Sequence, residues 1–138
     1  MDFKPVFLDI MDKARYIALA TSVGDAPNVR IVNCAWHDDC LYFSTFKGTT
    51  KLSEIGQNAN VAFITLPTEG IQFVRVSKAT AKTSVKTMDD LKDVFITKDP
   101  QMVHILASVP AGAWEVCEVH FTEADVTKDF GEMGQISL

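Results

Sequence analysis

The chain has 138 residues, of which 47% are hydrophobic, and this length and composition suit one globular domain with a buried core. Its formal net charge of −5 argues against the broad basic surface that non-specific nucleic-acid binding requires. Its uncharged apolar runs are far shorter than the roughly 20 residues of a membrane-spanning helix, so neither nucleic acid nor membrane is an expected partner.

The N-terminus and the cysteines indicate where the protein works. Residues Met1 to Pro5 contain no basic segment followed by an apolar stretch, so we expect neither a signal peptide nor a lipid anchor. Cys34, Cys40 and Cys117 show no C-x-x-C spacing and lie among apolar residues. Buried thiols are therefore favoured over a disulfide framework or a zinc knuckle. We expect a cytoplasmic protein without a metal site.

The first half of the chain predicts a helix followed by strands. Apolar residues recur at helical spacing from Phe3 to Ala14, behind a proline that a first helical turn tolerates. Runs of β-compatible residues between turn-forming residues predict strands over Tyr16 to Ser22, Val29 to Trp36, Leu41 to Phe46 and Val61 to Leu66. A short helix with a threonine N-cap is expected over Thr49 to Ile55.

The second half predicts one long strand, two short helices and a final strand. The long strand covers Ile71 to Val85 and bends partway. Thr87 and Asp90 have the spacing of a capping box, which begins the first helix, and the second helix follows Asp99-Pro100. After a strand over Ala113 to Phe121, we expect an edge strand over 123–130 and then a loose tail that contains glycine.

This order of elements predicts a single mainly β domain over residues 1–138. Strands joined by short turns, with only short helices between them, are typical of a small closed or partly closed antiparallel barrel, because closure removes exposed strand edges. The N-terminal helix is expected to cover one end of this barrel. A doubly wound parallel sheet is the weaker alternative, since the strands do not alternate with long helices.

The residues with the most informative chemistry lie between Arg30 and Lys51. A strand that carries an arginine is followed by a strand ending in hydroxyl residues and by a helix that opens with threonines and lysines. Unpaired amides at a helix N-terminus, with hydroxyl and ammonium groups nearby, favour a phosphomonoester. Alternatively, Thr49 only caps the helix while Lys47 and Lys51 point into water. Neither a nucleotide phosphate loop nor a G-x-G-x-x-G motif is present.

In order and spacing, several segments resemble the pyridoxamine 5'-phosphate oxidase-like family. These segments are Arg30-Ile31-Val32, Leu41 to Thr45, Lys47, Thr49-Thr50-Lys51, Asn58 to Ala62 and Val74-Arg75-Val76. The resemblance implies a six-stranded, antiparallel, Greek-key split β-barrel with short peripheral helices. It also implies a homodimer that binds two FMN molecules at the subunit interface.

The resemblance further implies a set of cofactor-binding residues. They are Arg30, Ile31, Val32, Ser44, Thr45, Lys47, Thr49, Thr50, Lys51, Gln72 and Trp114. Arg30 would lie by the phosphate or ribityl chain, Val32 and Gln72 by the isoalloxazine ring, and the lysines and threonines after the third strand at the phosphate. Trp114 would either pack against the flavin from the partner subunit or anchor the barrel or dimer core.

These observations lead to an FMN-dependent oxidoreductase as the principal hypothesis. The electron donor would be NADH or NADPH, and the acceptor a small organic molecule or oxygen. The chain ends without the arginine and histidine motif that holds the vitamin B6 phosphate ester in the true oxidase, which argues against that substrate. A non-catalytic flavin-binding or redox-sensing module is the alternative, and haem or a deazaflavin are alternative cofactors. The scattered histidines, His37, His104 and His120, give little support to hydrolytic or zinc chemistry.

Overall fold

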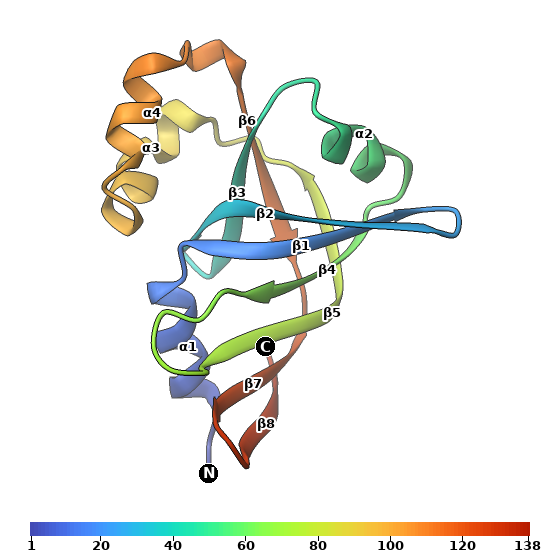
Figure 1. Ribbon diagram of the computed structural model, residues 1–138, viewed down its shortest axis with the longest axis vertical. Coiled ribbons are helices and arrows are strands. Elements are labelled where there is room, and N and C mark those ends of the chain that lie inside the picture. Colours follow the sequence, from blue (N-terminus) through green and yellow to red (C-terminus); the bar gives the residue numbers. More distant parts are fainter.

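A computed structural model describes all 138 residues and has a mostly β architecture (Figure 1). The strands are β1 (Tyr16–Val23), β2 (Ala26–His37), β3 (Cys40–Phe46), β4 (Asn60–Thr65), β5 (Phe73–Thr83), β6 (Trp114–His120), β7 (Glu123–Asp129) and β8 (Glu132–Ser137). The helices are α1 (Lys4–Lys13), α2 (Thr50–Gln57), α3 (Met88–Lys98) and α4 (Met102–Ser108), with a 3₁₀ turn at Ala111–Ala113. None of these helices is long and apolar enough to span a bilayer.

Six of the strands close into the predicted antiparallel barrel. The sheet runs in the order β4-β1-β2-β3-β6-β5, and an additional pairing of β4 with β5 closes it. The strands β1, β2 and β3 form consecutive hairpins, and β4 returns to pair with β1, which is the Greek-key arrangement. Helix α2 connects β3 to β4, while α3 and α4 connect β5 to β6 (Figure 1).

Short turns determine where the first hairpins reverse. The β1–β2 turn contains only Gly24 and Asp25, and Gly24 has a positive φ of 58° that glycine adopts without strain. The segment 26–28, which the sequence predicts as turn, therefore belongs to β2. In the β2–β3 turn, Asp38 and Asp39 both have positive φ, as a two-residue hairpin requires.

The expected bend of the long strand is confirmed in β5. Between the pairs Val61–Ala79 and Phe63–Val76, β4 advances by two residues and β5 by three, so β5 carries one extra residue. One end of β5 pairs with β6 and the other with β7. The bulge thus allows one strand to serve both the barrel and the β7–β8 hairpin.

The larger core fills the barrel, and α1 covers one of its ends as predicted. Phe7 is fully buried, and its ring meets Trp36 and Phe121 edge-on at centroid distances of 5.6 and 6.2 Å. Such edge-to-face contacts add about 0.5–1.5 kcal/mol each beyond the area they bury. This aromatic cluster therefore attaches α1 to the barrel end that lies opposite α2 (Figure 1).

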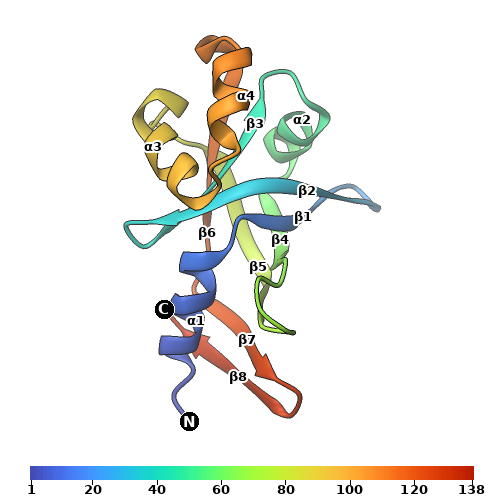
Figure 2. The same ribbon diagram turned by 60° about the vertical axis from the view of Figure 1, so that its left-hand side comes forward.

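A smaller core lies outside the barrel, between α3, α4 and the outer faces of β2, β3 and β6. Leu91 and Phe95 of α3 pack there against Tyr42 and Trp114. The predicted capping box is confirmed: the Thr87 hydroxyl accepts from the Asp90 amide, and the Asp90 carboxylate accepts from the Thr87 amide. Figure 2 shows this helical layer at the same end of the molecule as α2.

The prediction of a loose C-terminal tail is wrong. Residues Glu132–Ser137 form β8, which pairs with β7 along its length after a turn at Gly131 with φ 75°. The strand crosses Phe3 so closely that a Cβ at Gly134 would overlap the phenyl ring. The N-terminal segment therefore packs on the last strand, and both termini lie near the β7–β8 hairpin (Figure 2).

Candidate functional site

The junction between β3 and α2 gathers hydroxyl and ammonium groups at one end of the barrel. Thr45 points inward at the end of β3, and Gly48, with φ 79°, turns the chain into the helix. Thr49 is the N-cap residue, but its side chain makes no capping hydrogen bond. Its hydroxyl lies 3.4 Å from the Thr45 hydroxyl, and the Lys51 ammonium donates to Thr45 Oγ1 at 2.7 Å. The sequence-predicted residues Thr45, Thr49 and Lys51 therefore form one cluster.

Lys51 carries a positive charge in a partly desolvated position. Burial and, secondarily, the Arg30 guanidinium lower the pKa of its ammonium group. It forms no ion pair with a carboxylate, and its hydrogen-bond acceptor, the Thr45 hydroxyl, carries no charge to neutralise it. The first turn of α2 contains no acidic residue, and its leading amides lack intrahelical partners. The local field therefore favours an anion.

Arg30 lies beside this cluster but is already bonded. Its guanidinium donates to Thr21 Oγ1 at 2.8 Å, to the Leu19 carbonyl at 3.2 Å and to Glu54 Oε1 at 2.8 Å. The ion pair with Glu54 is largely buried, with side-chain exposures of 18% and 13%. Arg30 thus has a fixed orientation, and its carboxylate partner partly opposes anion binding.

Two other predicted residues lie at the solvent-facing side of the junction. The side chains of Lys47 and Thr50 are exposed. The Lys47 amide donates to the Ala113 carbonyl at 2.9 Å, which joins the β3–α2 turn to the segment before β6. These two side chains are available to a ligand that approaches from solvent.

Ser44 and Trp114 are found on the other face of the β3–β6 pair. Because side chains alternate along a strand, Ser44 and Phe46 face outward while Thr45 faces into the barrel. Trp114 packs on Phe46 with a centroid distance of 4.6 Å, and its buried indole Nε1 has no hydrogen-bond partner. An unpaired buried donor is costly, so a ligand acceptor at this point would be stabilised.

The remaining predicted residues do not join the cluster within one chain. Val32 is buried in the barrel core, whereas Ile31 is on the outer face and 62% exposed. Gln72 lies in the turn before β5, where its amide donates to the Glu69 carbonyl at 3.1 Å. This turn is at the barrel end away from α2 (Figure 1). The structure therefore separates Gln72 from Lys51.

Sequence reasoning missed Thr21 and Glu54, which hold Arg30. Neither residue belongs to a recognisable motif, since Thr21 is one of many strand threonines and Glu54 is an ordinary helical glutamate. The one available signal is that Thr21 lies on the inward-facing side of β1, the strand that pairs with the strand carrying Arg30. This signal can be used only once the β1–β2 register is known. The Glu54 contact depends on the tertiary placement of α2.

Comparisons with known proteins agree with this fold. No curated protein matches the sequence. A NimC/NimA family protein from Clostridium acetobutylicum shares 19% identity and a TM-score of 0.72, over 97% of this chain and 91% of that one. HutZ, the haem storage protein from Vibrio cholerae, shares 12% identity and a TM-score of 0.66, over 99% and 95%. A haem-binding protein from Mycobacterium smegmatis shares 9% identity and a TM-score of 0.70, over 93% and 55%.

At these identities, the solved structures establish the likeness of fold alone. The family model described as pyridoxamine 5'-phosphate oxidase-like matches residues 10–133, a span from the last turns of α1 to the start of β8. This match covers all six barrel strands and the β3–α2 junction. The chain therefore belongs to the pyridoxamine 5'-phosphate oxidase-like family.

Proposed function

We propose that this protein binds FMN, with the flavin phosphate at the cluster of Thr45, Thr49 and Lys51. The observation that carries the proposal is the half-buried ammonium of Lys51, which lacks an acidic partner beside a helix N-terminus. A phosphate there would receive charge-assisted hydrogen bonds from the lysine and from backbone amides. Exposed Lys47 and Thr50 would close over it from the solvent side.

The proposed activity is that of an oxidoreductase. Bound flavin would supply hydride and electron transfer between NADH or NADPH and a small organic acceptor or oxygen. The chain's own contribution is to hold and orient the cofactor: Arg30, fixed by Glu54 and Thr21, keeps a positive charge near the phosphate. Trp114 would offer its unpartnered Nε1 as a donor on the outer face of the β3–β6 pair. Three free thiols suit the reducing cytoplasm that we propose as its location.

Titration of the purified protein with FMN tests this proposal directly. We expect quenching of flavin fluorescence at one FMN per chain, and reduction of the bound flavin by NADH or NADPH. A protein that takes up no FMN would refute the proposal. Binding without reduction or reoxidation would instead identify the non-catalytic flavin-binding or redox-sensing module.

Haem is the second candidate cofactor, because two proteins with this fold are haem-binding or haem-storage proteins. The β3–α2 cluster itself offers no imidazole, and the usual axial ligands of haem are His, Cys, Met and Tyr. The donor set therefore favours a phosphate over iron. Absorbance spectra after titration with haem, FMN and a deazaflavin would distinguish the three, since a Soret band marks haem.

We further propose that the protein is a homodimer. On the outer face of β2, Val29 and Ile31 are 64% and 62% exposed, and the register places Ala20 and Ala18 of β1 beside them. This apolar strip adjoins Arg30 and is covered by no element of the chain. An isologous contact between two such strips would bury it and bring a second chain to the cofactor.

Light scattering during size-exclusion chromatography tests the dimer. We expect twice the mass of one chain for the wild type, and a monomer for Ile31→Lys because a charged side chain in an apolar interface is costly. Asp25→Lys, in the exposed β1–β2 turn, is the matched control. A wild-type monomer at micromolar concentration would refute the proposed dimer.

A further inference from the structure

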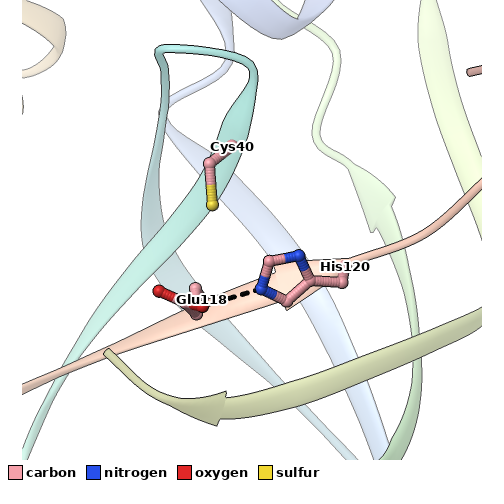
Figure 3. Close-up of side chains that lie close together, drawn as sticks. All are labelled: Cys40, Glu118 and His120. Atoms are coloured by element: carbon pink, nitrogen blue, oxygen red, sulfur yellow. Dashed lines mark hydrogen bonds and ion pairs between the residues drawn. The ribbon is translucent and has the colours of Figure 1, made fainter. Parts of the chain in front are cut away.

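Three side chains that suit a metal ion meet on the outer face of the β3–β6 pair. Cys40 begins β3, while Glu118 and His120 lie at alternate positions near the end of β6. One donor atom from each lies within 4.8 Å of the other two (Figure 3). The cluster combines a thiol, a carboxylate and an imidazole, which are the three ligand types that bind zinc in proteins.

The sheet register explains why these residues converge. Leu41 pairs with Val119, and Tyr42 pairs with Glu118. One more step along this register, toward the β2–β3 turn, sets Cys40 opposite His120. Residues directly opposite on antiparallel strands have Cβ atoms roughly 4.5–5.5 Å apart. The β2–β3 turn, with positive φ at Asp38 and Asp39, places Cys40 at this end of the strand. The site is thus formed by rigid strands.

We propose that Cys40, Glu118 and His120 bind one zinc ion. Zinc bonds of about 2.0–2.3 Å require neighbouring ligand atoms roughly 3.3–3.8 Å apart in a tetrahedron. The His120 Nε2 and Glu118 Oε1 atoms are 2.8 Å apart, so zinc replaces their hydrogen bond after a small separation of the two side chains. Half of the His120 side chain is exposed, which gives that movement room.

Of the three proposed ligands, His120 is the one that borders open space. His120 lines one cavity of about 600 Å³ with Asn60 and Thr80, and a second of about 400 Å³ with Lys4 and Trp36. Zinc sites with three protein ligands complete their tetrahedron with water or a bound small molecule. With three donors in the cluster, the fourth ligand here is therefore solvent or a small molecule.

Another group contacts one of the same three residues. The Lys82 ammonium lies 3.4 Å from Glu118 Oε1. Burial raises the pKa of the Cys40 thiol, and zinc binding would displace the thiol proton. Lys82 is 68% exposed and can swing into solvent. It is a competitor for Glu118 that zinc must displace.

The zinc site is separate from the proposed flavin site. Cys40 and Thr45 lie at opposite ends of β3, which places them roughly 17 Å apart at the rise of an extended strand. Zinc binding therefore needs no flavin. It can be measured on protein free of cofactor, and its failure would leave the flavin proposal untouched.

The test uses the untagged full chain, treated with a chelator and then titrated with ZnCl₂ in a calorimeter. We expect one zinc per chain, and at least a roughly tenfold loss of affinity for Cys40→Ser, Glu118→Gln and His120→Gln. His104→Gln, an exposed histidine on α4, is the matched control and should bind as the wild type does. Equal affinity in His120→Gln and His104→Gln would overturn the proposal.

Two measurements on the wild type keep the test decisive even if a variant fails to fold. With CoCl₂ we expect a thiolate-to-cobalt charge-transfer band and strong visible bands of a tetrahedral ion. Zinc should also slow alkylation of Cys40 by iodoacetamide, mapped by mass spectrometry, while Cys34 and Cys117 stay buried throughout. A weak octahedral cobalt spectrum, or Cys40 alkylated at the same rate with and without zinc, would overturn the proposal.

Lys82→Met provides a test in the opposite direction. Removal of the ammonium that competes for Glu118 should tighten zinc binding. Lys92→Met, which removes an exposed lysine of α3 away from these cavities, is its control. Weaker binding in Lys82→Met would overturn the assignment of Glu118 as a ligand.

Discussion

Replacement of Lys51 by methionine tests the phosphate cluster most sharply. Methionine keeps the length of the side chain but removes the ammonium that donates to Thr45 at 2.7 Å. A hydrogen bond to a charged group contributes about 1.5–3 kcal/mol, which is roughly 10- to 150-fold in Kd. We therefore expect FMN affinity to fall by that factor in Lys51→Met, while Lys92→Met, an exposed lysine of α3, should bind FMN as the wild type does.

Riboflavin isolates the phosphate from the ring. It carries the same isoalloxazine and ribityl groups as FMN but no phosphate, so Lys51→Met should bind riboflavin as the wild type does. The assay is a fluorescence titration of both proteins with both ligands. An equal loss for FMN and riboflavin would refute the phosphate assignment, because the lysine would then act on the ring or on the fold.

Thermal unfolding without ligand separates a functional lysine from a structural one. Because the pKa of Lys51 is lowered in the folded chain, mainly by burial, the folded state holds this proton less tightly than the unfolded state. At neutral pH the charged lysine therefore opposes folding, and this cost fades as pH rises through the lowered pKa. Lys51→Met without ligand should melt at or above the wild-type temperature. A clear drop would contradict this reasoning.

Three further changes test other parts of the structure. Glu54→Gln removes a negative charge beside the proposed phosphate and should tighten FMN binding in the same titration; weaker binding would contradict the placement of the anion. Asp90→Asn breaks the capping box, where hydrogen bonds from Thr87 lower the pKa of the carboxyl below its usual 3.8. The loss of thermal stability in Asp90→Asn, relative to the wild type, should be present above pH 3.8 and should vanish as pH falls through the lowered pKa. Gly134→Ala should destabilise the fold by about 1–3 kcal/mol in urea denaturation, because the new methyl group displaces the ring of Phe3.

Local chemistry made much of the fold predictable from the sequence. The Thr87 and Asp90 capping box depends on groups three residues apart, and the structure contains both of its hydrogen bonds. The Asp38-Asp39 turn is equally local, since two residues with positive φ suffice to reverse the strand. Thr45, Thr49 and Lys51 fall within one strand–helix junction, so their proximity also follows from short-range sequence.

Features that depend on long-range packing could not be predicted from the sequence. The segment 132–137 is short and contains glycine, and it becomes a strand only because β7 and Phe3 lie beside it. The Glu118-x-His120 spacing gives no metal signal by itself, because the third donor, Cys40, comes from a strand far away in the chain. An i, i+2 pair on a strand shares one face, so the strand register was the missing information.

The donor atoms, rather than the barrel, decide which cofactor such a fold can hold. The end of the barrel below α2 presents hydroxyl and cationic groups, which suit a phosphate. The one soft ligand near it, Cys117, is fully buried, and burial raises the pKa of its thiol to about 12. A thiol in that state is a poor ligand for haem iron. The imidazole of His120 lies with Cys40 at the far end of β3. The groups that we propose to bind phosphate and zinc thus lie at opposite ends of the same strand pair.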